Sequence, residues 1–286
     1  MAEQRAVAQV VPATAVSEGA GVRILRTIGT PARRHLDPFL MLDHFGTDNP
    51  DDYGAGFPDH PHRGFITLTY MLDGHMAHGD SMGNEGRLDP GGAQWMKAGS
   101  GVIHSEMPRQ EAGLMRGFQL WINLPAAEKM SAPEYQEIRP EAVPEVAEEG
   151  VVIRVLAGRY GETAGPVEDP NTDVSYLDVR LEPGSTFTHQ PPDGHAAFAF
   201  LFEGSARVAG QDVPDTSLIV LGEEGAVTVN AGPEGARLLL VAGRPIGEPI
   251  AQYGPFVMTN REELEQAFRD YRDGNLVRDR AAFREI

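Results

Sequence analysis

Glycine and proline interrupt this chain at short intervals along its whole length. There are 33 Gly and 22 Pro, and short apolar runs lie between them. Several runs alternate apolar and polar residues, as in ITLTY at 66–70, which is typical of a strand with one buried face. We predict an all-β protein with strands at 64–72, 92–97, 117–124, 151–157, 175–181, 196–203, 217–221, 226–230 and 236–242.

The length of the chain favours two domains. At roughly 150 residues per domain, 286 residues predict two. Prolines and acidic residues gather between Ala126 and Gly150, so we place the N-terminal domain at residues 1–135 and the C-terminal domain at residues 136–286. Pro58–Gly74 and Pro183–Gly204 both run from proline, through histidine, into an apolar strand that ends in an acidic residue and glycine. This weak repeat indicates the duplication of one β-barrel.

One helix is expected, near the C-terminus. Asn260 provides an N-cap with Glu263 three residues later, an apolar stripe at helical spacing runs to Tyr271, and Gly274 provides a stop. We interpret the stripe as the face that packs on a barrel, in preference to a binding surface for a partner.

The charge of the chain limits its partners. Asp and Glu number 42 and Lys and Arg number 24, which gives a formal net charge of −18. Binding of nucleic acid or of an anionic membrane surface is therefore not expected, because such affinity comes mostly from Lys and Arg. The start of the chain lacks the continuous apolar core of a signal peptide, and no run is long enough to span a bilayer. We expect a cytoplasmic protein.

The chain has no cysteine, so any metal site must use His, Asp or Glu. His60 and His62 are two residues apart, as are His104 and Glu106. In a strand this spacing places both side chains of a pair on the same face. Two adjacent strands could therefore bring three imidazoles and one carboxylate to one ion. The common alternative is that these histidines lie on the surface or are hydrogen-bonded in the core.

Nitrogen and oxygen ligands of this kind suit Fe(II), Mn, Ni, Co or Zn. With four protein ligands, an octahedral iron would keep two open positions, as an oxygenase requires.

These motifs resemble the two motifs of the cupin superfamily, and the chain is similar to the pirin family along most of its length. The segments that carry the resemblance are LDPFLMLDHF at 36–45, HPHRGF at 60–65, HGDSMGNEG at 78–86, QWMKAGSGVIHSEMP at 94–108, QLWINLP at 119–125, KMSAPEYQ at 129–136 and GPFVMTNREELEQAFRDY at 254–271.

The resemblance implies a bicupin: two antiparallel β-barrels of the jelly-roll type, with one metal ion in the N-terminal barrel only. The family's metal is usually Fe(II), with Mn, Ni, Co, Cu and Zn as alternatives. Its ligands fall on His60, His62, His104 and Glu106. The second barrel is expected to be metal-free, because the histidines at 189 and 195 are six residues apart and no HxE motif follows them.

The resemblance also implies an activity, namely a quercetin 2,3-dioxygenase that cleaves a flavonol with dioxygen. We assign Glu106 a second, catalytic role, in which it takes the proton of the flavonol 3-hydroxyl. The alternative is a metal-dependent regulatory protein that binds a basic protein partner and has no physiological turnover. We expect a monomer in either case.

Ile66 departs from the family pattern, because pirin-like chains commonly carry Glu at this position. We expect a hydrogen bond near the metal to be missing as a result. His75 and His78 are interpreted as hairpin residues or as contacts of the ligands. Arg63 directly follows the HPH motif, and it would face either a substrate oxygen or a surface acid.

Overall fold

The computed structural model describes residues 4–286, which form two compact all-β units. The N-terminal unit comprises Ala15–Arg26, Phe39–Ala142 and Ile246–Ile286. The C-terminal unit comprises the described residues up to Thr14 together with Thr27–Pro38 and Val143–Pro245. The sequence-based prediction of an all-β chain with one short helix is therefore confirmed.

The N-terminal unit contains an eight-stranded sheet and a four-stranded sheet. In sheet order, the first consists of β2 (Thr14–Glu18), β3 (Val22–Arg26), β4 (Phe39–Thr47), β11 (Met115–Asn123), β6 (Phe65–Asp73), β9 (Ala93–Lys97), β12 (Glu134–Ile138) and β25 (Ala282–Glu285). The second consists of β5 (Phe57–His62), β10 (Val102–Pro108), β7 (Met76–Asp80) and β8 (Glu85–Leu88). The hairpin of β23 (Ala251–Tyr253) and β24 (Phe256–Met258), the helix α1 (Arg261–Arg272) and two short 3₁₀ turns (Pro50–Asp52 and Pro140–Ala142) complete the unit.

The C-terminal unit contains a nine-stranded sheet around one apolar core. Its main path is β1 (Val7–Pro12), β21 (Ser217–Leu221), β19 (Ala196–Val208), β22 (Val227–Gly243), β17 (Ser175–Leu181), β14 (Val151–Ala157) and β13 (Glu145–Glu148). Off this path, β18 (Thr186–His189) pairs with β22 and β20 (Gln211–Val213) pairs with β19. A separate small hairpin joins β15 (Arg159–Tyr160) and β16 (Thr163–Ala164).

Several predicted strands have the bounds that the sequence indicated, namely β14, β17 and β21. The strands predicted at 226–230 and 236–242 are instead parts of one long strand, β22. Its partner β19 follows it across the interruption, because the register of the pair shifts between Gly204 and Ala206. Such a shift keeps two strands paired where one of them has extra residues.

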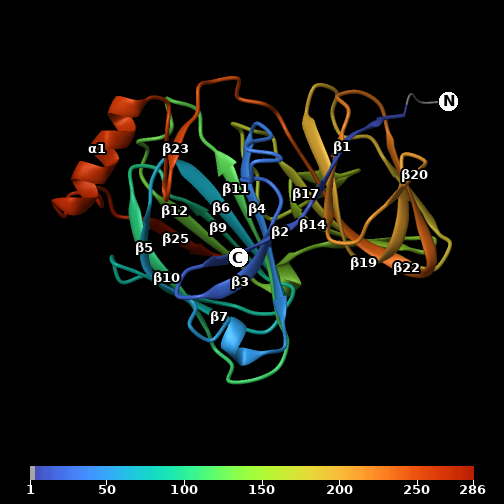
Figure 1. The fold of residues 1–286 in the computed structure, drawn as a ribbon, viewed down its shortest axis with the longest axis horizontal. Helices are drawn as coiled ribbons and strands as arrows, with labels where there is room; N and C mark the ends of the chain where they lie inside the picture. The colour runs from blue at the N-terminus through green and yellow to red at the C-terminus, as the bar shows by residue number, and fades with distance from the viewer. Residues whose placement is uncertain (1–3) are drawn as a thin grey trace. The chain divides into compact units, whose positions relative to one another are not determined.

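The helix α1 forms where the capping pattern predicted it. The side chain of Asn260 accepts a hydrogen bond from the Glu263 amide at 2.9 Å. Past the end of the helix, Gly274 adopts a φ of +75°, which glycine reaches without strain. The helix contacts β23 and β24 of the N-terminal unit (Figure 1). It has 12 residues, and no helix within residues 4–286 is long and apolar enough to span a membrane.

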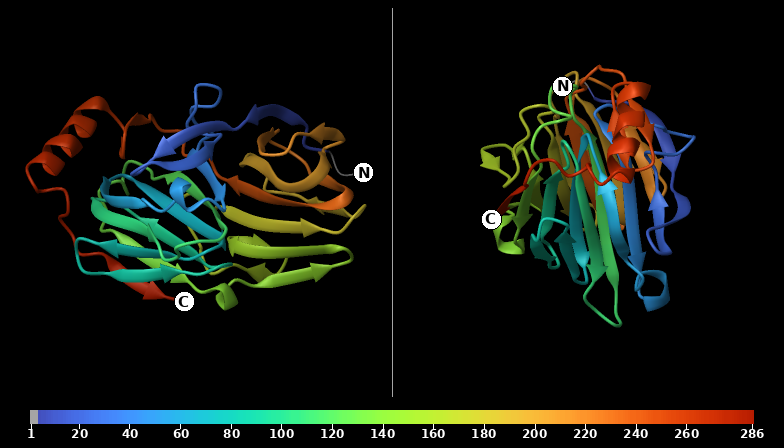
Figure 2. Two further views of the ribbon diagram at one scale, coloured as in Figure 1. Left: turned by 60° about the horizontal axis from the view of Figure 1, so that its bottom comes forward. Right: turned by 90° about the vertical axis from the view of Figure 1, so that its left-hand side faces the viewer.

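The two ends of the chain depart from the expected division at residues 135 and 136. Residues 246–286, which we assigned to the C-terminal barrel, belong to the N-terminal unit. There β25 pairs in parallel with β12, so the red end of the chain lies along that unit (Figure 2). At the other end, β1 pairs with β21 of the C-terminal unit. Edge strands take whichever partner completes their backbone hydrogen bonds, and a linear boundary in the sequence carries no information about that partner.

Candidate metal centre

His60, His62 and His104 come together on the paired strands β5 and β10. In the antiparallel register His60 lies opposite His104, and His62 lies opposite Val102. The ring centroids are 4.4 Å apart for His60 and His104, 4.7 Å for His60 and His62, and 5.0 Å for His62 and His104. One nitrogen from each ring lies within 4.8 Å of the other two. The spacing of two residues therefore produced the shared face that we expected.

Two of these rings are oriented by hydrogen bonds at their second nitrogen. His60 Nδ1 lies 2.8 Å from the Pro58 carbonyl oxygen, to which it donates. His104 Nδ1 lies 3.1 Å from His78 Nε2. This is the arrangement in which histidine ligands of metals are usually held, with one nitrogen on an outer partner and the other free for the ion.

Three of the four ring nitrogens that remain are buried and make no well-formed hydrogen bond among residues 4–286. These are both ring nitrogens of His62 and Nε2 of His104. Burial lowers the pKa of His62 and of His104 well below the usual value, and neighbouring histidines lower it further, while a weaker contact of His62 with the Pro255 backbone acts in the opposite direction. Both imidazoles are therefore neutral at pH 7 and keep a lone pair. Because buried polar atoms without a partner are costly, the cluster fits one divalent metal ion.

Glu106 is buried in the same region but does not belong to the group of three nitrogens. The register of β5 and β10 shifts between His104 and Glu106, so that Glu106 pairs with Phe57 and β5 has one extra residue. The carboxylate accepts hydrogen bonds from the Thr69 hydroxyl at 3.2 Å and from Gln119 Nε2 at 3.4 Å. Burial raises the pKa of Glu106. The bulge that shifts this residue could not be predicted from the sequence.

A cavity of about 630 Å³ opens beside the cluster. His60, His62 and Glu106 line it together with Trp121, Gln119 and Thr69. Trp121 packs on Phe65, with ring centroids 4.1 Å apart, and meets His62 edge-on at 5.2 Å. This volume lies within the range of small-molecule sites, which are usually concave and mostly apolar with a few polar groups.

Of the other histidines considered in the sequence analysis, only His78 contacts the cluster. His75 lies at the surface and pairs with Asp89 at 2.6 Å, whereas His78 is buried against His104. In the C-terminal unit, His189 stacks on Phe187, and His195 Nε2 lies 3.8 Å from Asp173.

Ile66 lies on the opposite face of β6 from the cavity. Side chains alternate along a strand, and Thr69 on this strand lines the cavity while Ile66 does not. The carboxylate expected at position 66 would therefore not reach the histidine cluster. Thr69 and Gln119, the two residues that hydrogen-bond to Glu106, were not identified from the sequence. Alternation placed Thr69 on one face of its strand, but no local pattern identified that face as the one toward Glu106.

Comparison with known proteins agrees with this architecture. The family model for pirin matches residues 21–122, and the model for the pirin C-terminal cupin domain matches residues 176–277. A pirin-like protein of Caulobacter vibrioides is 50% identical over 272 residues, covering 94% of this chain and 98% of the relative.

Two solved structures are also similar. The crystal structure of quercetin 2,3-dioxygenase from Acinetobacter baumannii is 31% identical, covers 96% of this chain and 99% of its own, and gives a TM-score of 0.89. A bacterial pirin from Escherichia coli in complex with nickel(II) is 19% identical, covers 83% of this chain and 98% of its own, and gives a TM-score of 0.66. The second likeness shows the fold alone.

The nearly all-β architecture, with two cupin domains and one short C-terminal helix, is that of a bicupin, as the resemblance implied. Within that class, the chain belongs to the pirin family.

Proposed function

We propose that this protein is a metal-dependent dioxygenase that uses Fe(II) and dioxygen to cleave the central ring of a flavonol such as quercetin. The observation that carries the proposal is the group of three histidine nitrogens beside a cavity of about 630 Å³. The buried ring nitrogens of His62 and Nε2 of His104 make no well-formed hydrogen bond among residues 4–286. The similarity to a structure described as quercetin 2,3-dioxygenase supports the class of substrate.

His60, His62 and His104 would hold the ion, with Glu106 as the fourth ligand. A bound divalent metal would supply Lewis-acid chemistry toward an oxygen of the substrate. The chain prepares the nitrogens for that ion by burial, because the lowered pKa of His62 and His104 keeps their lone pairs available. The C-terminal unit, whose three histidines (His35, His189 and His195) lie outside any such group in residues 4–286, would hold no metal.

Glu106 would also act as the base that takes the proton of the flavonol 3-hydroxyl. Its raised pKa, caused by burial, brings a carboxyl group closer to the range in which a general base is effective at neutral pH. Thr69 and Gln119 hold the two oxygens in place through their hydrogen bonds. This fixed position would keep one oxygen directed at the bound hydroxyl.

The walls of the cavity favour a flat aromatic substrate. Trp121 lines the cavity beside His62 and is backed by Phe65, which is fully buried behind it, and Met41 and Phe45 extend the apolar lining. An aromatic ring system would bury its faces against these side chains and exclude water from the region of Glu106.

The test combines metal analysis of the purified protein with oxygen uptake on quercetin. We expect about one metal ion per chain and oxygen uptake in the wild type, and loss of both in His62→Ala. His189→Ala is the matched control in the C-terminal unit, and it should keep both. Glu106→Gln should keep most of the metal and lower turnover by about 100-fold, the lower range for loss of a general base.

The outcomes separate the two functional classes. Bound metal without oxygen uptake would refute the dioxygenase and favour a metal-dependent regulatory protein. Protein prepared without chelator that contains no metal would argue against both functions. Unchanged turnover in Glu106→Gln would remove this residue from the proton transfer.

A further inference from the structure

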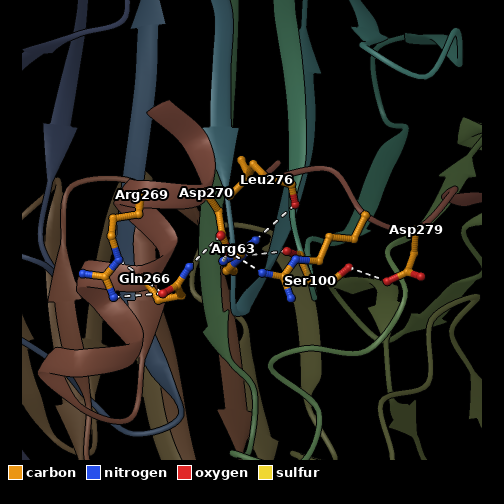
Figure 3. Close-up of polar contacts among 8 residues, drawn as sticks. Arg63, Ser100, Gln266, Arg269, Asp270, Leu276 and Asp279 are labelled. Atoms are coloured by element: carbon orange, nitrogen blue, oxygen red, sulfur yellow. Dashed lines mark hydrogen bonds and ion pairs between the residues drawn. The ribbon is translucent and has the colours of Figure 1, made fainter. Parts of the chain in front are cut away.

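Arg63, the residue directly after His62, is buried, with 1% of its side chain exposed. Its guanidinium group donates hydrogen bonds to three groups from distant segments (Figure 3). Nε reaches the Ser100 carbonyl at 2.6 Å, Nη1 reaches the Asp270 carboxylate at 2.7 Å, and Nη2 reaches the Leu276 carbonyl at 3.1 Å. Arg63 is absent from the lining of the cavity, so it does not face a substrate there.

These partners connect both ligand-bearing strands to the C-terminal segment. Ser100 lies in the turn that leads into β10 and His104, whereas Asp270 belongs to α1. The Asp270 carboxylate is itself held, because it accepts hydrogen bonds from Gln266 Nε2 at 2.7 Å and Arg278 Nη2 at 2.5 Å. The Arg63 side chain therefore ends on a carboxylate that is already held by Gln266 of α1 and by Arg278 in the segment after the helix.

The backbone beside Arg63 is bound to the same C-terminal segment. The Val257 amide donates to the Arg63 carbonyl at 3.0 Å, and Lys129 Nζ donates to the carbonyls of Gly64 and Val257 at 2.8 and 3.0 Å. Gly64 has a φ of +88°, and a Cβ at this position would lie 2.0 Å from the Val257 carbonyl oxygen. Only glycine permits this close approach.

His62 differs from the other two histidines in how it is oriented. His60 is held by the Pro58 carbonyl and His104 by His78, whereas the ring nitrogens of His62 make no well-formed hydrogen bond among the described residues and have only a weaker polar contact with the Pro255 backbone. The position of the His62 ring therefore comes mainly from its packing and from its backbone. That backbone is continuous with Arg63.

We propose that Arg63, anchored by Asp270 of α1, is a positioning residue that fixes the backbone of His62 and thereby sets the metal affinity of the histidine cluster. The inference rests on the proposed metal site. It gives α1, which is 207 residues away in sequence, a role in the metal centre that its apolar stripe did not indicate.

Asp270→Asn tests this role, because it removes the charge that anchors Arg63 and keeps the size of the side chain. With Co(II) as the probe, we expect about 10-fold weaker binding, at the lower end of what loss of an outer-shell partner costs. We also expect an altered Co(II) absorption spectrum at saturation. In the metal-free protein, the amide hydrogens of Gly64 and Val257 should exchange faster, since both lie beside Arg63.

Asp178→Asn is the matched control. Asp178 is also buried and accepts two hydrogen bonds from Arg237, at 2.7 and 3.0 Å, in the C-terminal unit. It should destabilise the fold in a similar way and leave Co(II) affinity and spectrum unchanged. If Asp270→Asn does not fold, Gln266→Ala removes one of the bonds that fix the carboxylate, and a smaller change in the same direction is expected.

Three results would count against the proposal. If Asp270→Asn binds Co(II) within about twofold of the wild type and with the same spectrum, the ion pair is structural only. If Asp178→Asn changes Co(II) binding equally, the effect is general destabilisation. If the wild type binds no Co(II), both this inference and the proposed metal site are wrong.

Discussion

Each unit of this protein contains one prominent buried polar cluster, and the two clusters are satisfied in different ways. In the N-terminal unit, three imidazoles converge, and buried nitrogens of His62 and His104 make no well-formed hydrogen bond among the described residues. In the C-terminal unit, the fully buried Arg5 lies between two loops and donates hydrogen bonds to five carbonyl oxygens at 2.7 to 3.0 Å. These acceptors belong to Pro191, Pro192, His195, Gly222 and Gly225.

This difference shows that buried polar atoms in the same architecture can be satisfied either by a side chain of the protein or by a cation from solution. A buried acceptor is stable only when a donor or cation reaches it. The C-terminal unit obtains its cation from its own chain, because Arg5 satisfies the loop carbonyls. The N-terminal unit instead leaves neutral ring nitrogens unpaired, which fits a cation taken from solution. Three predictions test how far this contrast holds.

Arg5→Met should have the largest effect, and only on stability. Five carbonyl oxygens would lose their donor, and leaving buried polar groups unpaired typically costs 1–3 kcal/mol each before the loops relax. We therefore expect the free energy of unfolding to fall by at least about 3 kcal/mol in chemical denaturation, with Co(II) affinity unchanged. Arg207→Met, at an exposed site in the same unit, should change stability by less than about 0.5 kcal/mol. A loss of Co(II) binding in Arg5→Met would show that the units are not independent.

His78→Phe should have an intermediate effect, and only on metal binding. Phe retains the packing of this ring against Tyr135 but removes the hydrogen bond to His104 Nδ1. Co(II) affinity, measured by competition with a chelator, should fall by about 10- to 100-fold. His75→Phe is the control from the same hairpin, because His75 pairs with Asp89 at the surface. Equal Co(II) affinities in the two variants would contradict the assigned role of His78.

The smallest effect concerns pH and His44, which stacks on Phe118 away from the metal site. Burial, with a smaller contribution from Arg116, lowers the pKa of His44 to about 4. The unfolded chain takes up a proton near pH 6.5 and the folded chain does not, so stability decreases as pH falls below about 6.5.

Between pH 6.5 and 5.5, this single residue should cost the metal-free wild type about 1 kcal/mol, a loss that His44→Phe should avoid. Denaturation curves of both proteins at the two pH values measure the difference. Equal losses would mean that His44 is protonated in the folded state.

Much of the fold could be predicted because its signals are local. The bounds of β14, β17 and β21 follow from apolar runs between turn residues, and α1 follows from the Asn260 cap and its stripe. The pairing of β19 with both halves of β22 could not be predicted, since it depends on a register shift between the two strands.

The candidate site divides in the same way. The spacing of His60 and His62 placed both rings on one face, and the structure set His104 opposite them. Other features depend on contacts between segments that are distant in sequence. These are the bulge that displaces Glu106, the contact of His78 with His104 and the pairing of Arg63 with Asp270. No repeat or motif connects such partners, so they were missed or left open.

By itself, the sequence determined that this chain forms two all-β units and that any metal ligand must be a nitrogen or an oxygen atom. Turn residues and strand alternation act locally, and the chain has no cysteine. Only the tertiary structure decided that the C-terminal segment packs on the N-terminal unit and that Arg63 meets Asp270. The physical reason is that a buried guanidinium group and an unpaired sheet edge each need a partner, and the fold supplies that partner from whichever segment it brings near.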